Sequence, residues 1–443
     1  MGSIANIIFF FLIFFSKPLL AALSNQIGAS TSLLGLNMLM SGFEENISES
    51  QTQHPAKLAH LKKNQHSMHT FYSLYNFSNI HNITLQNTAT SGVSATSGDY
   101  DPNPPNQLMA AYHYSLKLSN TWYAQSLGIS LIAPLPELMV IDTTSSFLPK
   151  YTWYDSKLNK TELYFLLTQK FNAQWSSSVG LVSNWDLVGQ SEVTAGLTGG
   201  AASSGRIQAK LKPKFFTQLA LAYTMQHFAI HLSWNPSSQQ ELTNQVIGKA
   251  PIGGSSTVDY TFRMIAQNHF EPMQSKIDMT LKHLAPWHFL GGISYQDWSN
   301  FESNRLQIID ANGVITNSQN YEVLKGKKIF SPALGLEYGE TDQTIYSLSY
   351  RYRPNVLDKN HNDSGNTLDQ NTHIVGMAIK HESELFSIPL SWSFGIQHHY
   401  LPTRVITKTA NQEDGTAGSK VGAPSYTSGG TFTIMAAGLN YSF

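Results

Sequence analysis

The sequence contains no cysteine, so neither a disulfide framework nor a thiolate metal site can form. Charged residues make up only 13% of the chain, about half the share expected of a soluble domain. The net charge of −1 gives no basis for a nucleic-acid partner. Mean hydropathy is −0.20, too low for a bundle of transmembrane helices. What remains is a neutral-polar, aromatic composition, which suits strands with one apolar and one polar face.

One continuous apolar run stands near the N-terminus, from Ile7 to Phe15, and is followed by Ser16-Lys17-Pro18. A helix that spans a bilayer needs about 20 apolar residues. This shorter run is typical of a signal peptide, so we expect residues 1–24 to be one and the protein to be exported. Cleavage is expected after Ala22 or Ser24. A short membrane anchor is the alternative, because no Lys or Arg precedes the run.

From about Asn106 onward, apolar and polar residues alternate with a period of two, which indicates strands. The strands come in pairs joined by short turns, and long connections rich in Gly, Ser, Asn and Pro separate the pairs. The long connections are expected at about 87–105, 134–159, 188–205, 236–256, 300–327, 354–370 and 401–427. A first strand in 64–86 and a last strand at 428–443 bring the expected number to about fourteen.

Strict alternation of long and short connections, with an even number of strands, is the pattern of an outer-membrane barrel. We therefore predict an all-β fold, a 14-stranded antiparallel transmembrane β-barrel over residues 64–443. Short turns and both chain ends are expected on the periplasmic side of the outer membrane of a Gram-negative (diderm) bacterium. A soluble β-sandwich or β-helix is the alternative, but a sandwich requires neither feature. Aromatic girdles at the two membrane interfaces are expected from Tyr112, Tyr114, Trp122, Trp175, Trp185, Trp287 and Trp298.

Residues 25–63 do not alternate and precede the first strand. They must hang in the periplasm or fold into the lumen, which side chains alone do not fill in a barrel of this size. We expect an N-terminal hatch that plugs the lumen and offers an apolar surface to a hydrophobic ligand. The residues expected to form that surface are Leu33, Leu34, Leu36, Met38, Leu39 and Met40. The alternative is a disordered leader whose leucines help to fill the barrel.

Several stretches of the sequence form a further pattern. They are Ser30-Thr31-Ser32-Leu33-Leu34-Gly35 and His54-Pro55-Ala56-Lys57-Leu58-Ala59 before the barrel, and Tyr295–Phe301, Ala333–Tyr338 and Gly438–Phe443 within it. In order and spacing, over most of the mature chain, they resemble the FadL-type outer-membrane transporters, which carry long-chain fatty acids and, in relatives, aromatic hydrocarbons. Three positions depart from the family's pattern, since His54 replaces an Asn while Leu33 and Lys57 each replace a Gly.

The resemblance implies passive uptake of hydrophobic molecules, without a cofactor, through an apolar pocket beside the hatch and a lateral opening in the wall. Gly35, His54, Pro55 and Ala56 would position the hatch. Leu138 and Phe147, in an apolar loop, are candidates for the surface that captures the ligand. Pro134 either interrupts a strand to make the opening or simply ends that strand. Candidate partners for a ligand carboxylate are Lys117, Lys170, Lys210, Lys212, Lys276 and Lys282.

Other classes of function are weighed against this one. A general diffusion porin is the main alternative, and long loops suit a surface protein or adhesin. We expect no enzyme, because no motif ties Ser, His and Asp together. We also expect no metal site, because His227 and His231 lie on a strand, His398 and His399 point to opposite faces, and no carboxylates accompany them.

The chain ends in Thr431–Phe443, with aromatic residues on one face of the last strand. Tyr441 and Phe443 resemble the signal that barrel-assembly machinery reads. The expected partners are this machinery, outer-membrane lipids and hydrophobic small molecules, with the protein a monomer.

Overall fold

The computed structural model describes residues 29–43, 51–86, 96–118, 125–135, 149–151, 153–154, 161–194, 204–251, 257–301, 307–309, 325–339, 344–357, 367–385, 388–407 and 425–442. Two short helices come first, the α-helix α3 (Thr31–Gly35) and the 3-10 helix η2 (Pro55–His60). The strands of the wall are β1 (Gln65–Phe77), β4 (Gln107–Lys117), β5 (Ser126–Pro134), β7 (Glu162–Lys170), β8 (Trp175–Thr194), β9 (Ser204–Thr224), β10 (Phe228–Asn235), β13 (Met273–Leu284), β14 (Trp287–Asp297), β16 (Lys328–Tyr338), β17 (Thr344–Arg353), β19 (Thr372–Leu385), β20 (Ile388–Thr407) and β21 (Ser425–Ser442).

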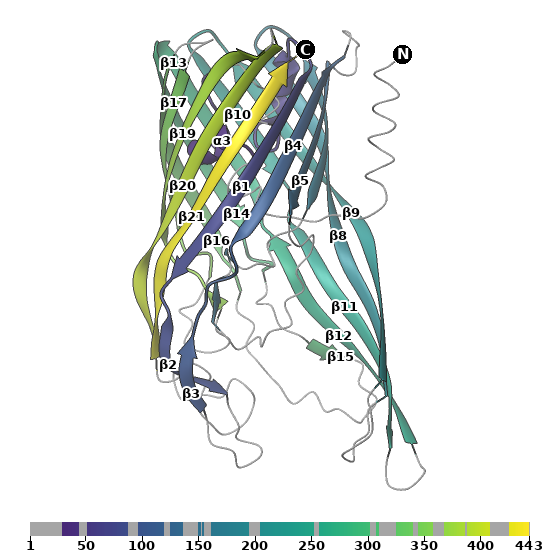
Figure 1. The fold of residues 1–443 in the computed structure, drawn as a ribbon. Helices are drawn as coiled ribbons and strands as arrows, with labels where there is room; N and C mark the ends of the chain where they lie inside the picture. Colours follow the sequence, from purple (N-terminus) through teal and green to yellow (C-terminus); the bar gives the residue numbers. More distant parts are fainter. Residues whose placement is uncertain are drawn as a thin grey trace.

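These strands form a closed 14-stranded wall in which each strand is antiparallel to both neighbours. The last strand, β21, pairs with β1 from Gln65↔Ser442 to Phe77↔Gly430 and closes the barrel (Figure 1). The prediction of a 14-stranded antiparallel barrel is confirmed.

One expectation about the strands was wrong. The connection at 236–256 is largely strand, because β11 (Ser238–Pro251) pairs with β12 (Thr257–Glu271) in a hairpin beyond the wall, while β10 pairs directly with β13. The long loops also contain β2 (Ile80–Gln86), β3 (Thr96–Tyr100), β6 (Lys150–Tyr151), β15 (Gln307–Ile309) and β18 (Thr367–Leu368).

The two faces of the wall differ in polarity. Large apolar side chains such as Leu334, Phe330 and Met377 are exposed on the outer face. Inward positions hold buried polar side chains such as Ser130 and Ser294. An apolar outer band and a polar interior are what a barrel in a lipid bilayer requires. No helix within the described residues is long and apolar enough to cross a membrane.

The girdle prediction holds only in part. Trp175 and Trp287 are exposed beside the short turns, each with its ring centroid within 4.6 Å of that of a tyrosine on the next strand. Trp298 was expected in a girdle, but its side chain is only 3% exposed. After β14 ends, the chain turns so that Trp298 packs on Phe301, with 5.8 Å between ring centroids. The side chains of Trp122 and Trp185 lie outside the described part of the chain.

The N-terminal segment, defined as residues 29–43 and 51–63, lies within the barrel at the end that carries the short turns (Figure 1). Its helix α3 packs against β17, β19, β20 and β21. Its helix η2 packs against β5, β7, β8 and β9, which are on the opposite side of the wall. The segment therefore crosses the lumen and contacts the wall on both sides.

Candidate functional site

Inward side chains of the wall hold the N-terminal segment through its backbone carbonyl groups. Each bond has a wall donor and a segment carbonyl: Ser349 to Gly35 (2.7 Å), Arg351 to Asn37, Lys276 to Met38, Thr280 to Met40 (2.7 Å), Gln218 to Thr52 (2.8 Å) and Ser176 to Ala56 (3.1 Å). A carbonyl group is present whatever side chain the segment carries. Side chains of the segment add further bonds to the wall, such as Ser41 to Glu337 (2.7 Å) and Gln51 to Ser115 (2.7 Å).

Close approach of backbones fixes the position of α3. A Cβ atom added at Gly376 of β19 would lie 2.6 Å from the Gly35 carbonyl oxygen. One added at Gly35 would lie 2.3 Å from Cβ of Ala378. Both distances are shorter than real Cβ contacts, so α3 rests directly on β19. This contact gives the predicted motif residue Gly35 a physical reason.

The six apolar residues expected to line a binding surface are all buried, with at most 4% of any side chain exposed. Leu36 and Leu39 pack with Leu290 and Ala333 of the wall. Beside them lies a cavity of about 40 Å³ whose lining mixes these leucines with Lys57, Glu337 and Lys380. It has room for a few water molecules, whereas sites for small-molecule ligands have roughly 300–1,000 Å³. The other two expected contacts, Leu138 and Phe147, lie outside the described residues.

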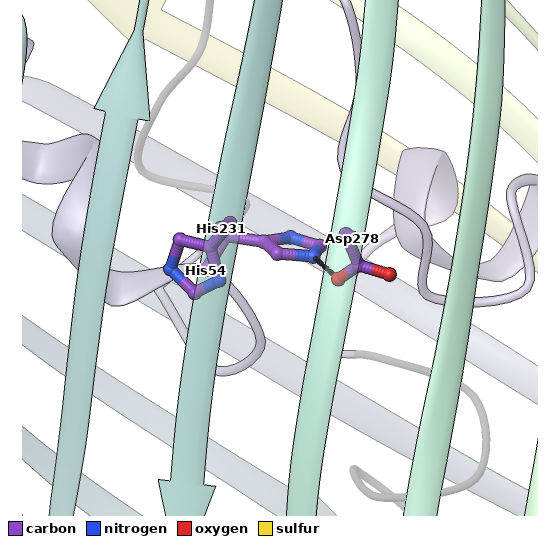
Figure 2. Close-up of side chains that lie close together, drawn as sticks. All are labelled: His54, His231 and Asp278. Carbon is purple, nitrogen blue, oxygen red and sulfur yellow. Dashed lines mark hydrogen bonds and ion pairs between the residues drawn. The ribbon is translucent and has the colours of Figure 1, made fainter.

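Four buried polar residues meet where the segment touches β10 and β13. His231 of β10 and Asp278 of β13 are direct partners in the strand register, and both face inward. His54, just before η2, has its Nε2 atom 2.8 Å from Oδ2 of Asp278, and Nζ of Lys276 is 2.9 Å from the same oxygen. Figure 2 shows His54, His231 and Asp278 close together, with the bond between His54 and Asp278 dashed.

Burial, and then the ammonium group of Lys276, lower the pKa of His54 well below its usual value. A neutral His54 with its proton on Nε2 donates a hydrogen bond to the carboxylate of Asp278. Lys276 supplies the countercharge that a buried carboxylate requires.

Pro55 and Ala56 continue the predicted motif. Pro55 is the first residue of η2, where no N–H group is needed for a helical hydrogen bond. Ala56 packs on Ala220 and Ala222 of β9. The structure thus places Gly35 on one side of the lumen and the three residues of the His54-Pro55-Ala56 motif on the other.

The C-terminal signal is only partly within the described residues. Tyr441 lies on β21 opposite His66 of β1, with 6.5 Å between ring centroids. Phe443 lies outside the described part of the chain. The barrel-assembly role of the two aromatic residues stays a prediction.

At the level of sequence, neither a protein-family model nor a curated protein matches the chain. A solved FadL homologue from Pseudomonas aeruginosa is similar in structure, with a TM-score of 0.58 and 11% identity over 96% of this chain and 100% of that one. The P. putida toluene transporter TodX has a TM-score of 0.53 and 10% identity over 94% of this chain and 99% of that one. The chain has the FadL-type fold.

Within the FadL-type fold, sequence reasoning found some residues of the interface and missed others. Lys276 was expected to face the lumen and is buried at the N-terminal segment, whereas the other five candidate lysines are exposed or half-buried. Asp278 and Arg351 were missed, and His231 was considered only together with His227 and not at this interface. These residues take inward positions on predicted strands. In an antiparallel barrel, the wall strands before and after the connection at 236–256 are neighbours, so the sequence could have placed His231 and Asp278 close together.

Proposed function

We propose that the protein takes up long-chain fatty acids or similar hydrophobic molecules across the outer membrane by diffusion down a gradient. The observation that carries this proposal is the N-terminal segment, which crosses the lumen and buries six apolar residues there. The FadL-type fold supports it, because solved structures with that fold include the toluene transporter TodX, whose mutant structure is described as a monoaromatic hydrocarbon channel.

In this proposal, the N-terminal segment is the hatch. When the segment shifts, its leucines and methionines form an apolar pocket with the wall. The tail of the ligand contributes most of the binding there, at about 0.8 kcal/mol per buried methylene group. We place the exit sideways through the wall, because a route through the end of the barrel would return an apolar molecule to water.

Pro134 is the last residue of β5 and pairs with Met109, and the ladder between β4 and β5 continues without a shift to Lys117↔Ser126. On the other side, the pairing of β5 with β7 stops at Ile132↔Glu162, two residues before the proline. The role of Pro134 in a lateral opening stays a prediction.

Deleting residues 25–60 tests the hatch. We expect oleate uptake to fall several-fold because the apolar path is lost, while small sugars begin to pass through the unblocked lumen. Radiolabelled oleate uptake is measured in cells that lack their own fatty-acid transporter, and sugar passage is measured by liposome swelling. Toluene uptake in parallel distinguishes the two classes of ligand.

A milder variant, Pro55→Ala, keeps the segment and alters only the start of η2. The shift in electrophoretic mobility on heating reports whether each variant is folded. Unchanged oleate uptake in a folded deletion variant contradicts the gating role. Sugar passage in the unaltered protein, without uptake of oleate or toluene, indicates a general diffusion porin instead.

A further inference from the structure

His54, His231 and Asp278 come from three different elements and meet at one point inside the barrel. One ligand-type atom from each residue lies within 4.8 Å of the other two. None of the three side chains is more than 1% exposed. Two imidazoles and one carboxylate form a donor set typical of zinc sites, and nitrogen donors argue against magnesium or calcium.

The hydrogen bonding of these residues is incomplete. Among the described residues, no protein group bonds to either ring nitrogen of His231, to Nδ1 of His54 or to Oδ1 of Asp278. Buried polar atoms without partners are rare in native structures, and several at one point indicate an additional occupant. The unpaired ring of His231 is edge-on to the ring of His54, with 4.9 Å between centroids.

We propose that a divalent transition-metal ion of the zinc class binds between His54, His231 and Asp278 and joins the N-terminal segment to the wall. Nε2 of His54 and Oδ2 of Asp278 are 2.8 Å apart. Two ligands of a tetrahedral zinc ion, each at about 2.0–2.1 Å, lie roughly 3.3 Å apart, so a small opening of this pair admits the ion. The fourth position is left for a water molecule.

Lys276 competes with the ion for Asp278. Its ammonium group is 2.9 Å from Oδ2 of Asp278 and 3.2 Å from Nε2 of His54. It also donates to the carbonyl oxygen of Met38, so it can leave the carboxylate and keep a partner in the segment. The ion and the ammonium group are thus alternative countercharges for the same carboxylate. This site does not depend on what the barrel transports.

Metal binding by the purified full chain, without a histidine tag, tests the proposal. Zinc bound per chain is measured by equilibrium dialysis and mass spectrometry, with Co²⁺ as a probe whose visible absorption distinguishes tetrahedral from octahedral coordination. We expect one zinc ion per chain and a tetrahedral cobalt spectrum. His54→Asn and His231→Gln each weaken binding by more than the roughly 10–100-fold that changes beyond the ligands themselves cost.

Two further variants sharpen the result. His398→Gln changes an exposed histidine of β20 and leaves binding unaltered. Lys276→Met removes the competing ammonium group and tightens binding by about tenfold or more, as expected when a like charge is removed at close range. His54 lies outside the wall strands, so His54→Asn provides the test even where His231→Gln does not fold.

Equal zinc binding in the His54→Asn, His231→Gln and His398→Gln proteins overturns the proposal, because it assigns the metal to surface histidines. An octahedral cobalt spectrum, or weaker binding in Lys276→Met, overturns it as well. Absence of zinc binding in the unaltered protein means that water alone occupies the site.

Discussion

Two interfaces inside the lumen differ in the atoms that form them. At the short-turn end, donors on the wall bind carbonyl groups of the N-terminal segment, and two backbones touch at Gly35 and Gly376. At the long-loop end, an inward segment, defined as residues 149–151 and 153–154, packs through aromatic side chains. The first interface therefore combines backbone groups of the segment with polar side chains such as His54, and the second consists mainly of aromatic side chains.

The aromatic contacts join the inward segment to several strands. Centroid distances are 4.2 Å between Tyr151 and Phe77 of β1, 5.1 Å between Tyr154 and Phe432 of β21, and 5.3 Å between Trp153 and Trp298. The guanidinium group of Arg353 lies over the Trp153 ring, 4.6 Å from its centroid.

The largest expected effect comes from breaking the backbone contact. In Gly376→Val, the added carbons collide with the carbonyl oxygens of Gly35 and Leu34, at 2.6 and 2.8 Å from the new Cβ. Neither backbone can move aside easily, so we expect α3 to leave the wall while the strand itself tolerates valine. Single-channel conductance in a planar bilayer should rise, and protease should cut the N-terminal segment.

Gly291→Val is the matched control for this change. Gly291 also lies in a wall strand, but the atom nearest to its added Cβ is Cδ2 of Leu334 at 3.7 Å, an ordinary contact. We expect no change in conductance for this variant. Equal conductance in the two variants would show that backbone contact does not hold α3 in place.

The next largest effect is expected at the buried ion pair of the aromatic end. Arg353 holds both carboxylate oxygens of Asp369, at 2.7 and 3.1 Å, and both side chains are buried. Arg353→Met leaves that carboxylate without its countercharge, which costs about 3–5 kcal/mol of unfolding free energy. Urea-induced unfolding in lipid, followed by tryptophan fluorescence, measures the loss.

An exposed ion pair supplies the comparison. Lys328 and Asp297 are 3.7 Å apart, and the lysine side chain is 61% exposed. Lys328→Met should change the unfolding free energy by only about 0–1 kcal/mol. If Arg353→Met has an effect no larger than this, the aromatic end does not depend on the buried pair.

The sequence was sufficient to predict the wall because each strand meets lipid on one face. A shift by one residue would turn every side chain of a strand to the wrong side, so alternation determines both the faces and the number of strands. The docking of α3 was beyond such reasoning. Ser349 and Arg351 each follow the residue that they bind by 314 positions, and the bonds go to carbonyl groups, which leave no mark in the segment's sequence.

The cluster of His54, His231 and Asp278 shows the same limit. No metal site was expected from histidines that are near one another in sequence, such as His227 and His231. The structure instead brings His231 to a carboxylate on the next strand of the wall and to a histidine of the N-terminal segment. The prediction that Trp298 belongs to a girdle failed for a related reason. The sequence at a strand end does not show whether the chain then turns toward lipid or into the lumen.

The smallest expected effect is the loss of one hydroxyl group from the inward segment. Burial raises the pKa of Tyr151 to about 12, so the hydroxyl keeps its proton. Its oxygen accepts from the Gly429 N–H at 2.8 Å and donates to the Gly429 carbonyl oxygen at 3.2 Å. Tyr151→Phe keeps the stacking on Phe77 and leaves the buried Gly429 N–H unpaired, which costs about 1–3 kcal/mol of unfolding free energy, while the Gly429 carbonyl oxygen keeps its bond from the Ser78 N–H. The same urea measurement detects the change, and Tyr350→Phe, which removes an exposed hydroxyl bonded to His373, is the control. If the unfolding free energy falls no more than in the control, aromatic packing alone holds the inward segment.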